Sequence, residues 1–366
     1  MRKILCIMQL PPPIHGANLM NSYLLNSKII NGNFNMQVVN LQFASSLKEI
    51  EKFSFHKVFK SIKFALIIFF KVMKFKPDLV YFTLSPKGFA FYRDTIYVSI
   101  LKLSHQKIVF HLHAQGIRME SERSWLKRKL AKFVFKNTHV ICLAKNLIED
   151  IKPIYSAVPF IVPCGIPIHP KSNQTKSRTN EVVQILYLSN YIKNKGILKL
   201  IDALKILSEQ KFFFKARLVG APTDLSIDTV ENYIRERGLQ NCVQVVGPKY
   251  NEEKYNELMS ADIFVLPSFN EAFPLVNLEA MQFSLPVLST NVGGVSEAVI
   301  NEETGFVVES RNVQQLADKL ILLIKDKNLR EQMGMKGKDR FCNNYTLRHF
   351  EYNIKNVFDI ILKTKD

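Results

Sequence analysis

The feature that most constrains this chain is a regular alternation of short, continuously apolar segments with longer segments of helical periodicity. In the first half the apolar segments lie at 3–9, 37–43, 78–84, 107–113, 139–144 and 159–163. In the second half they lie at 182–189, 214–220, 242–247, 262–268, 285–290 and 305–308. Strands that are apolar on both faces and separated by helices are typical of parallel sheets covered on both sides, so the sequence predicts an α/β protein.

A polar segment at 169–181 divides the two series of predicted strands. The chain has 366 residues, more than one hydrophobic core usually serves. We therefore expect two doubly wound, Rossmann-like domains, 1–170 and 182–345, joined by a linker at 171–181. Residues 346–366 are expected to form a helix that packs back toward the N-terminal domain. Ligands of doubly wound folds bind at the carboxyl ends of the strands, so a cleft between two facing domains is the expected site.

The cysteines and the apolar runs indicate a cytoplasmic protein. The five cysteines are scattered and never form a C-x-x-C pair, which predicts free thiols and no zinc site. The N-terminal MRKILCIMQLPPP is predicted to be a first strand rather than a signal peptide, because its short apolar run enters a proline cluster. The longest uninterrupted apolar run, 64–70, is far shorter than the ~20 residues that a membrane-spanning helix needs.

Net charge is distributed unevenly along the chain. Residues 1–170 carry 24 lysines and arginines against 8 acidic residues, or +16, whereas residues 171–366 carry 26 against 24, or +2. The basic half is therefore expected to face something anionic, and composition alone leaves nucleic acid and a bilayer surface both open.

Within the basic half, SERSWLKRKLAKFVFKNTHV projects as an amphipathic helix. One side of it holds a set that we call the basic stripe: Trp125, Arg128, Lys129, Lys132 and Lys136. The opposite side, expected to pack on the sheet, holds Leu126, Leu130, Phe133 and Val134. A tryptophan among cations suits an interfacial membrane helix, and a solvated charged face explains the pattern equally well. A second cationic set, in the segment 56–77, favours peripheral docking on anionic lipid and comprises Lys57, Lys60, Lys63, Lys71 and Lys74.

Three residues stand just after predicted strands, where doubly wound folds bind ligands. Gly16 precedes a helix expected from Asn18, and either close approach of an anion or simple packing explains it. His113, with His111 on the same face, ends the fourth strand, where a ligand contact and a plain hydrogen-bonded pair both fit and no metal site is indicated. Lys195 precedes the first helix after the linker, a place that suits a phosphate, although a solvated lysine fits this segment as well.

The stretch FNEAFPLVNLEAM, residues 269–281, carries Glu271 and Glu279 on either side of a predicted helix start. Pro274 is expected at the first helical position, which leaves the amides of 275–277 without intrahelical acceptors and so creates an anion site. The two carboxylates flank that site and can accept hydrogen bonds from hydroxyls. Hydroxyls on both sides of a diphosphate describe a nucleotide-sugar.

This region resembles glycosyltransferases of family 4, whose GT-B architecture consists of two facing Rossmann-like domains. Residues 261–308, from ADIFVLPSFNEAF to NEETGFVV, resemble the E-x(7)-E region of that family almost continuously. PPPIHGA, LYLSNYIKNKG, RLVG and REQMGMKGKDRFCNNYT occur in the family order, so the similarity spans nearly the whole chain. The resemblance implies a retaining hexosyltransferase that uses a UDP- or GDP-sugar and needs neither a metal nor another cofactor.

The resemblance also implies roles for individual residues. His113, Glu271 and Lys195 are the implied catalytic residues: His113 lies by the transferred sugar, Glu271 holds its hydroxyls, and Lys195 neutralises the departing diphosphate. Glu279 is implied to bind the ribose. The set implied to bind the donor is Gly16, Asn190, Lys195, Pro248, Lys249, Glu271, Ala272, Phe273, Leu275, Val276 and Glu279.

Four places depart from the family pattern. Asn190 stands where the family often has an arginine, which removes one positive charge from the diphosphate site. Cys164 precedes Gly165 where the family usually has asparagine, and Ala272 and Ser284 each replace a common glycine. The expected acceptor is a glycan or a polyprenyl-diphosphate-linked sugar in bacterial surface polysaccharide assembly, reached at an anionic membrane. A lipid head-group or storage-glycan transferase of the same fold is the alternative. A noncatalytic nucleic-acid-binding module leaves the two glutamates unexplained, so no nucleic-acid partner is expected.

Overall fold

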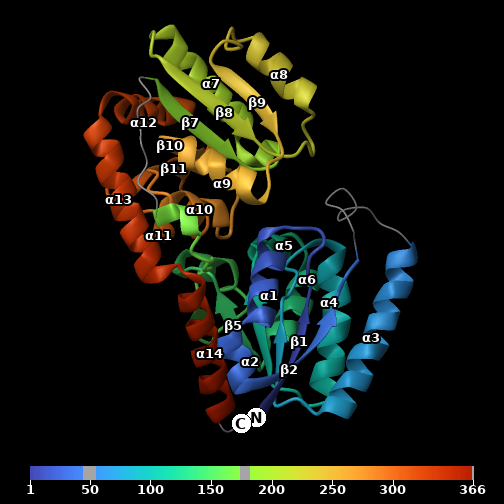
Figure 1. Ribbon diagram of the computed structural model, residues 1–366. Helices are drawn as coiled ribbons and strands as arrows, with labels where there is room; N and C mark the ends of the chain where they lie inside the picture. Colours follow the sequence, from blue (N-terminus) through green and yellow to red (C-terminus); the bar gives the residue numbers. More distant parts are fainter. Residues whose placement is uncertain (44–54, 174–181, 365–366) are drawn as a thin grey trace. The chain divides into compact units, whose positions relative to one another are not determined.

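The computed structural model describes residues 1–43, 55–173 and 182–364. The chain divides into two compact units, one made of Met1–Cys164 with Leu347–Asp366 and the other of Gly165–Thr346. Each unit contains one six-stranded parallel sheet with helices around it (Figure 1). The prediction of two doubly wound, Rossmann-like units is therefore confirmed.

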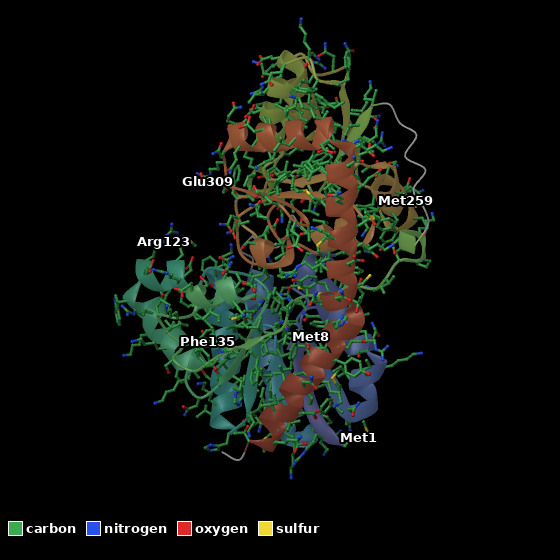
Figure 2. The ribbon with its side chains drawn as sticks, turned by 90° about the vertical axis from the view of Figure 1, so that its left-hand side faces the viewer. Met1, Met8, Arg123, Phe135, Met259 and Glu309 are labelled. Carbon is green, nitrogen blue, oxygen red and sulfur yellow. The ribbon has the colours of Figure 1, made fainter. Side chains whose placement is uncertain are left out.

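In the first unit the strand order is β2-β1-β3-β4-β5-β6. The strands are β1 (Arg2–Met8), β2 (Phe34–Asn40), β3 (Leu79–Phe82), β4 (Ile108–Leu112), β5 (His139–Cys142) and β6 (Phe160–Ile161). Each overlaps its predicted apolar segment. Every residue of β3 and β4 is buried, because helices cover both faces of the sheet there, as continuously apolar strands predict. In Figure 2 Met1 and Met8 mark the two ends of β1, and Met8 is at the carboxyl end, where ligands of such sheets bind.

The helices of the first unit form two layers. They are α1 (Gly16–Asn26), α2 (Lys28–Asn33), α3 (Phe55–Phe75), α4 (Gly88–Leu103), α5 (Ile117–Arg123), α6 (Trp125–Phe135), the 3-10 helix η2 (Lys145–Asp150) and α14 (Leu347–Lys363). The layer of α1, α2 and α14 covers one face of the sheet, and that of α3, α4 and α6 covers the other (Figure 1). Phe358 of α14 packs edge-on against Phe34 and Tyr81, with ring centroids 5.6 and 5.8 Å apart, which ties the last helix to this sheet.

In the second unit the strand order is β12-β11-β10-β7-β8-β9. The strands are β7 (Val183–Leu188), β8 (Phe214–Val219), β9 (Val243–Gly247), β10 (Ile263–Leu266), β11 (Val287–Thr290) and β12 (Gly305–Val308). Every residue of β10 and β11 is buried. The helices are η3 (Pro170–Asn173), η4 (Lys193–Lys195), α7 (Ile197–Glu209), α8 (Ile227–Arg235), α9 (Asn251–Ser260), α10 (Leu275–Gln282), α11 (Val295–Ala298), α12 (Val313–Lys325) and α13 (Lys327–Asn344).

The boundary between the units lies between Cys164 and Gly165 rather than in the predicted linker at 171–181. The amide of Ile166 donates a hydrogen bond to the carbonyl of Tyr345 at 3.0 Å, so the chain joins the second unit immediately after β6. Pro170–Asn173 forms η3 of that unit, and 174–181 lies outside the described residues.

The five cysteines of the chain are all free thiols, as predicted. In the described part of the chain, no helix is both long enough and apolar enough to cross a membrane.

Candidate active site

The loop after β10 brings together two of the predicted catalytic residues. The Oε1 atom of Glu271 accepts hydrogen bonds from Lys195 Nζ at 2.6 Å and from Ser268 Oγ at 2.8 Å. The two charged side chains are only 28% and 10% exposed, and 76 residues separate them in the sequence. Because water is largely excluded, this ion pair is stronger than a pair on the open surface.

Close backbone packing holds Lys195 at this place. Gly196, the next residue, has φ 76°, and a Cβ atom there would lie 1.9 Å from the carbonyl oxygen of Pro267. Only glycine permits this approach between η4 and the end of β10. The amide of Phe269 also donates to the carbonyl of Asn194 at 2.8 Å. Lys195 is therefore fixed beside the loop that carries Glu271.

Glu279, in the second turn of α10, forms a second ion pair. Its Oε1 atom accepts a hydrogen bond from Lys254 Nζ at 2.6 Å, and the two side chains are 8% and 22% exposed. Its Oε2 atom is buried and receives no hydrogen bond from the described residues. This oxygen is the free acceptor that a ligand hydroxyl requires.

Lys254 is a site residue that sequence reasoning misses. Burial alone would lower the pKa of its ammonium group, but the Glu279 carboxylate raises that pKa above its ordinary value. Lys254 is therefore protonated and neutralises Glu279. The only signal in the sequence is a lysine early in the helix after β9, at the carboxyl edge of the sheet, which does not reveal its partner 25 residues away.

The start of α10 differs from the prediction by one residue. Pro274 has extended backbone angles and is the N-cap, so the helix begins at Leu275 rather than at the proline. The amide of Asn277, predicted to be free, donates to the carbonyl of Pro274 at 3.1 Å. The amides of Leu275 and Val276 remain, and the described part of the chain supplies no acceptor for them. They retain the anion-binding capacity of a helix N-terminus.

The side chain of Asn277 is a second feature that the sequence does not reveal. The residue is fully buried, and neither Oδ1 nor Nδ2 has a hydrogen-bond partner among the described residues. An unsatisfied buried amide costs about 1–3 kcal/mol for each group, so such side chains are candidates to meet a ligand or a water molecule.

The other predicted donor residues have structural partners of their own. Asn190 Oδ1 accepts a hydrogen bond from the amide of Ala221 at 3.3 Å, which joins the loops after β7 and β8. The carbonyl of Ala272 accepts from the amide of Gly294 at 2.8 Å. Phe273 is buried, and its ring lies 5.8 Å from that of Tyr345. These three residues therefore shape the loops of the site.

Pro248 and Lys249 follow β9 at the carboxyl edge of the same sheet. Pro248 is exposed, and Lys249 Nζ pairs with Glu253 at 2.9 Å. Their placement after a strand suits a base-binding turn, as the resemblance implies.

The first unit has a cluster of histidines of its own at the carboxyl end of β4. The rings of His111 and His113 lie 4.0 Å apart, and His111 Nδ1 shares a 2.6 Å hydrogen bond with the hydroxyl of Tyr81. His15, which precedes Gly16 and caps α1, contributes to the electrostatic environment of His113. Helix α1 thus begins at Gly16, two residues before the predicted start at Asn18.

These histidines are neutral at neutral pH. Burial, together with nearby His15, lowers the pKa of His113 to about 3, and burial with nearby His113 lowers the pKa of His111 well below its ordinary value. The Nε2 atoms of both rings are buried and have no hydrogen-bond partner among the described residues. Sequence reasoning singles out His113 but misses His15, whose only signal is its place directly before the predicted loop glycine.

The basic stripe lies on the outer side of α6. Trp125 is 76% exposed, and the four cations of the stripe are exposed as well. The expectation that the opposite apolar set packs on the sheet is wrong for Leu126 and Phe133, which are 46% and 42% exposed. The reason is that Ala131, Val134 and Phe135 fill the buried side of the helix, while Lys127 pairs with Glu120 of α5.

Within the ranges that the structure describes, no three potential metal-ligating side chains lie close enough together to hold an ion.

Comparisons with known proteins bear mainly on the second unit. Residues 170–340 match the family model described as "Glycosyl transferases group 1". The resemblance to glycosyltransferases that the sequence indicated is thereby confirmed over this segment, while the narrower assignment to family 4 stays a prediction.

Curated relatives share this half of the sequence. A capsular polysaccharide biosynthesis glycosyltransferase, CapM of Staphylococcus aureus, is 30% identical over 188 residues, which are 51% of this chain and 48% of CapM. A D-inositol 3-phosphate glycosyltransferase of Corynebacterium aurimucosum is 33% identical over 46% of this chain and 38% of its own. The chain thus spans about half the length, or less, of the curated relatives it matches.

Solved structures extend the likeness of fold to the whole chain. A glycosyltransferase from Rickettsia africae matches with a TM-score of 0.79 and 21% identity over 100% of this chain and 99% of its own. Anabaena Alr3699/HepE in complex with UDP matches with a TM-score of 0.76 and 17% identity over 98% and 100%. The fold is therefore the GT-B fold that was predicted.

Proposed function

We propose that this protein transfers a sugar from a nucleotide-sugar to an acceptor hydroxyl, as a retaining hexosyltransferase. One observation carries the proposal: two shielded lysine–glutamate pairs, Lys195 with Glu271 and Lys254 with Glu279, lie at the start of α10, in the segment that matches the group 1 family model. Retention of configuration rests on the resemblance to family 4.

The chemistry follows from what each group can do. The bond from the anomeric carbon to the diphosphate oxygen breaks, and its electron pair leaves with the diphosphate. The acceptor oxygen bonds to the anomeric carbon and gives up its proton to the departing diphosphate. Negative charge therefore develops on the diphosphate before that proton arrives. Lys195 and the free amides of Leu275 and Val276 stabilise that charge. Glu271 then accepts hydrogen bonds from sugar hydroxyls in place of the one from Lys195. Glu279 Oε2 accepts a hydrogen bond from the ribose while Lys254 stays paired with Oε1 of the same carboxylate.

His113 is proposed to contact the transferred sugar. A neutral imidazole with an unpartnered Nε2 can donate or accept a hydrogen bond, depending on its tautomer. Because burial holds the ring neutral, it adds no positive charge beside the anomeric carbon. Gly16, at the start of α1, is proposed to bind the donor.

A UDP-sugar is the proposed donor, since solved structures of the same fold are described as complexes with UDP and with UDP-glucose. The proposed acceptor is a glycan or a polyprenyl-diphosphate-linked sugar, which the name of the capsular relative supports. We further propose a cytoplasmic enzyme that needs no metal, binds no nucleic acid, and reaches its acceptor at an anionic membrane surface through the basic stripe.

A thermal-shift screen tests the donor. UDP, GDP, ADP and their glucose conjugates are added to the purified chain, with EDTA in one arm and Mg²⁺ in another. We expect UDP ligands to raise Tm most, equally in both arms, and Glu279→Gln to reduce that shift. An oligonucleotide is added in a separate arm. If it raises Tm and no nucleoside diphosphate does, the transferase proposal is wrong.

A further inference from the structure

The solvent-facing side of α3 is apolar. Seven large apolar side chains, each between 42% and 73% exposed, recur at helical spacing along it and form what we call the apolar row: Val58, Phe59, Ile62, Leu66, Phe69, Phe70 and Met73. The buried side of the same helix has its own apolar residues, Ile68, Val72 and Phe75, which are at most 7% exposed. The apolar row is thus additional to what the fold needs for packing.

The neighbouring helix α4 continues this surface. Phe89, Ile96 and Leu103 recur every seven residues on its outer side and are 76%, 56% and 82% exposed. Helix α4 is fixed to α3, since the hydroxyl of Tyr97 donates to the carbonyl of Ser61 at 3.1 Å. Helices α3 and α4 lie side by side (Figure 1). Their exposed apolar residues therefore present one apolar surface to solvent. Exposed apolar patches of this extent mark interaction sites.

Helix α6, with the basic stripe, borders the same surface. Lys102 of α4 donates to the carbonyl of Phe133 at 2.7 Å, and its ammonium group lies 5.1 Å from the centroid of that ring. Helices α3, α4 and α6 thus form a single layer on one face of the sheet.

The charges of this layer have one sign. Helices α3 and α6 contain no aspartate or glutamate, and the single acidic residue of α4, Asp94, is fully buried and paired with Arg93. Exposed cations border the apolar row, namely Lys63 and Lys74 on α3. A surface that is apolar at its centre and cationic at its edges is complementary to an anionic bilayer.

We infer that the apolar row of α3, together with its continuation on α4, inserts into the interface of an anionic membrane, with α3 lying in the membrane plane. The basic stripe of α6 then contacts the head groups beside it. A second copy of this chain fits the surface less well, because it would oppose cations to cations with no acidic side chain from these helices between them. The inference adds a hydrophobic insertion surface to the electrostatic docking proposed above, and it is independent of the donor site.

Vesicle co-sedimentation tests the inference. The full chain is mixed with vesicles of phosphatidylcholine alone or of phosphatidylcholine with phosphatidylglycerol, at low salt and at about 0.5 M NaCl, where surface charges are screened beyond roughly 4–5 Å. The variants are F59Q/L66Q/F70Q in the apolar row and R128Q/K129Q/K132Q in the basic stripe. Phe213→Gln is the matched control, since Phe213 is 84% exposed in the second unit. F59L/F70L keeps the row apolar.

The two sets of variants have different expected signatures. F59Q/L66Q/F70Q should weaken partitioning into anionic vesicles at least about tenfold at both salt concentrations, because the lost contact is hydrophobic. R128Q/K129Q/K132Q should weaken it mainly at low salt. F59L/F70L and Phe213→Gln should bind like the parent. Trp125 is the only tryptophan of the chain, so a blue shift of its fluorescence on vesicles reports whether α6 joins the interface.

Two results would overturn the inference. One is that F59Q/L66Q/F70Q, shown by circular dichroism to be folded, sediments with anionic vesicles as well as the parent does. The other is that light scattering shows a parent dimer that this variant dissociates, which assigns the row to a second copy. The UDP-induced shift in Tm, measured on the same variants, keeps this outcome separate from the donor-site proposal.

Discussion

The two units treat charge in opposite ways. In the second unit, Lys195 and Lys254 each meet a shielded glutamate at 2.6 Å, so the candidate donor site carries strong charges that cancel. In the first unit, His111 is buried and His113 is partly buried, and both are neutral, whereas the cations of the basic stripe lie on the surface. In the candidate donor site, positive and negative side chains thus neutralise each other, whereas the cations of the basic stripe are exposed to solvent.

The two ion pairs of the second unit also determine how a substitution of either partner affects stability. Removal of one partner leaves a shielded charge without compensation, which costs more than the loss of an exposed pair.

The largest expected effect is that of Lys195→Ala. The lysine is proposed to meet the departing diphosphate, so its loss should remove about 2–4 kcal/mol of transition-state stabilisation in kcat/KM for sugar transfer. Lys193→Ala is the matched control, because Lys193 belongs to the same 3-10 helix but is exposed, and it should stay near the parent rate. A folded Lys195→Ala variant within tenfold of the parent would contradict the role.

The next largest effects are expected at Glu271 and Glu279, whose substitutions should change different kinetic constants. Glu271→Ala should lower kcat by roughly ten- to a hundredfold, since its carboxylate faces the reacting sugar in the proposed mechanism. Glu279→Ala should mainly raise KM for the donor, by about tenfold, because it binds the ribose before and during the reaction. Steady-state kinetics over a range of donor concentrations measure both. Identical changes in kcat and KM for the two variants would show that the assignment of separate roles is wrong.

The smallest effect concerns pH and the histidines of the first unit. The folded-state pKa of His113 is about 3 against 6.5 for a free histidine, so below pH 6.5 the unfolded chain binds a proton that the folded chain does not. The stability that the neutral ring contributes is complete above pH 6.5 and is lost as pH falls from there toward 3. The slope is at most about 1.4 kcal/mol per pH unit.

Urea unfolding at several pH values between 7.5 and 4.5 measures this slope. His113→Asn should flatten it, whereas His105→Asn, at an exposed turn with φ 49°, should leave it as in the parent. A His113→Asn variant with an unchanged slope would show that His113 is not held neutral by the fold.

Much of the fold was predictable because periodicity is a local property. Each continuously apolar segment overlaps a parallel strand, and the central strands β3, β4, β10 and β11 are fully buried. Lys195, His113 and Glu271 were singled out as candidate residues by their places at or after strand ends. The boundaries of helices and of the two units were harder to predict from the sequence. Pro274 proved to be the N-cap because its backbone is extended, and the boundary between the units lies at Cys164 because Ile166 bonds to Tyr345 across the sequence.

The order of strands and helices, the uneven charge of the two halves and the charged residues at the sheet edges can all be read from the sequence, since each depends on neighbouring residues. The tertiary structure is needed to show which lysine pairs with which glutamate, because those partners lie 76 and 25 residues apart. It also decided that α3 turns a second apolar side to solvent. A helical projection shows which residues share a side of a helix, but only packing against the sheet determines which side is left uncovered.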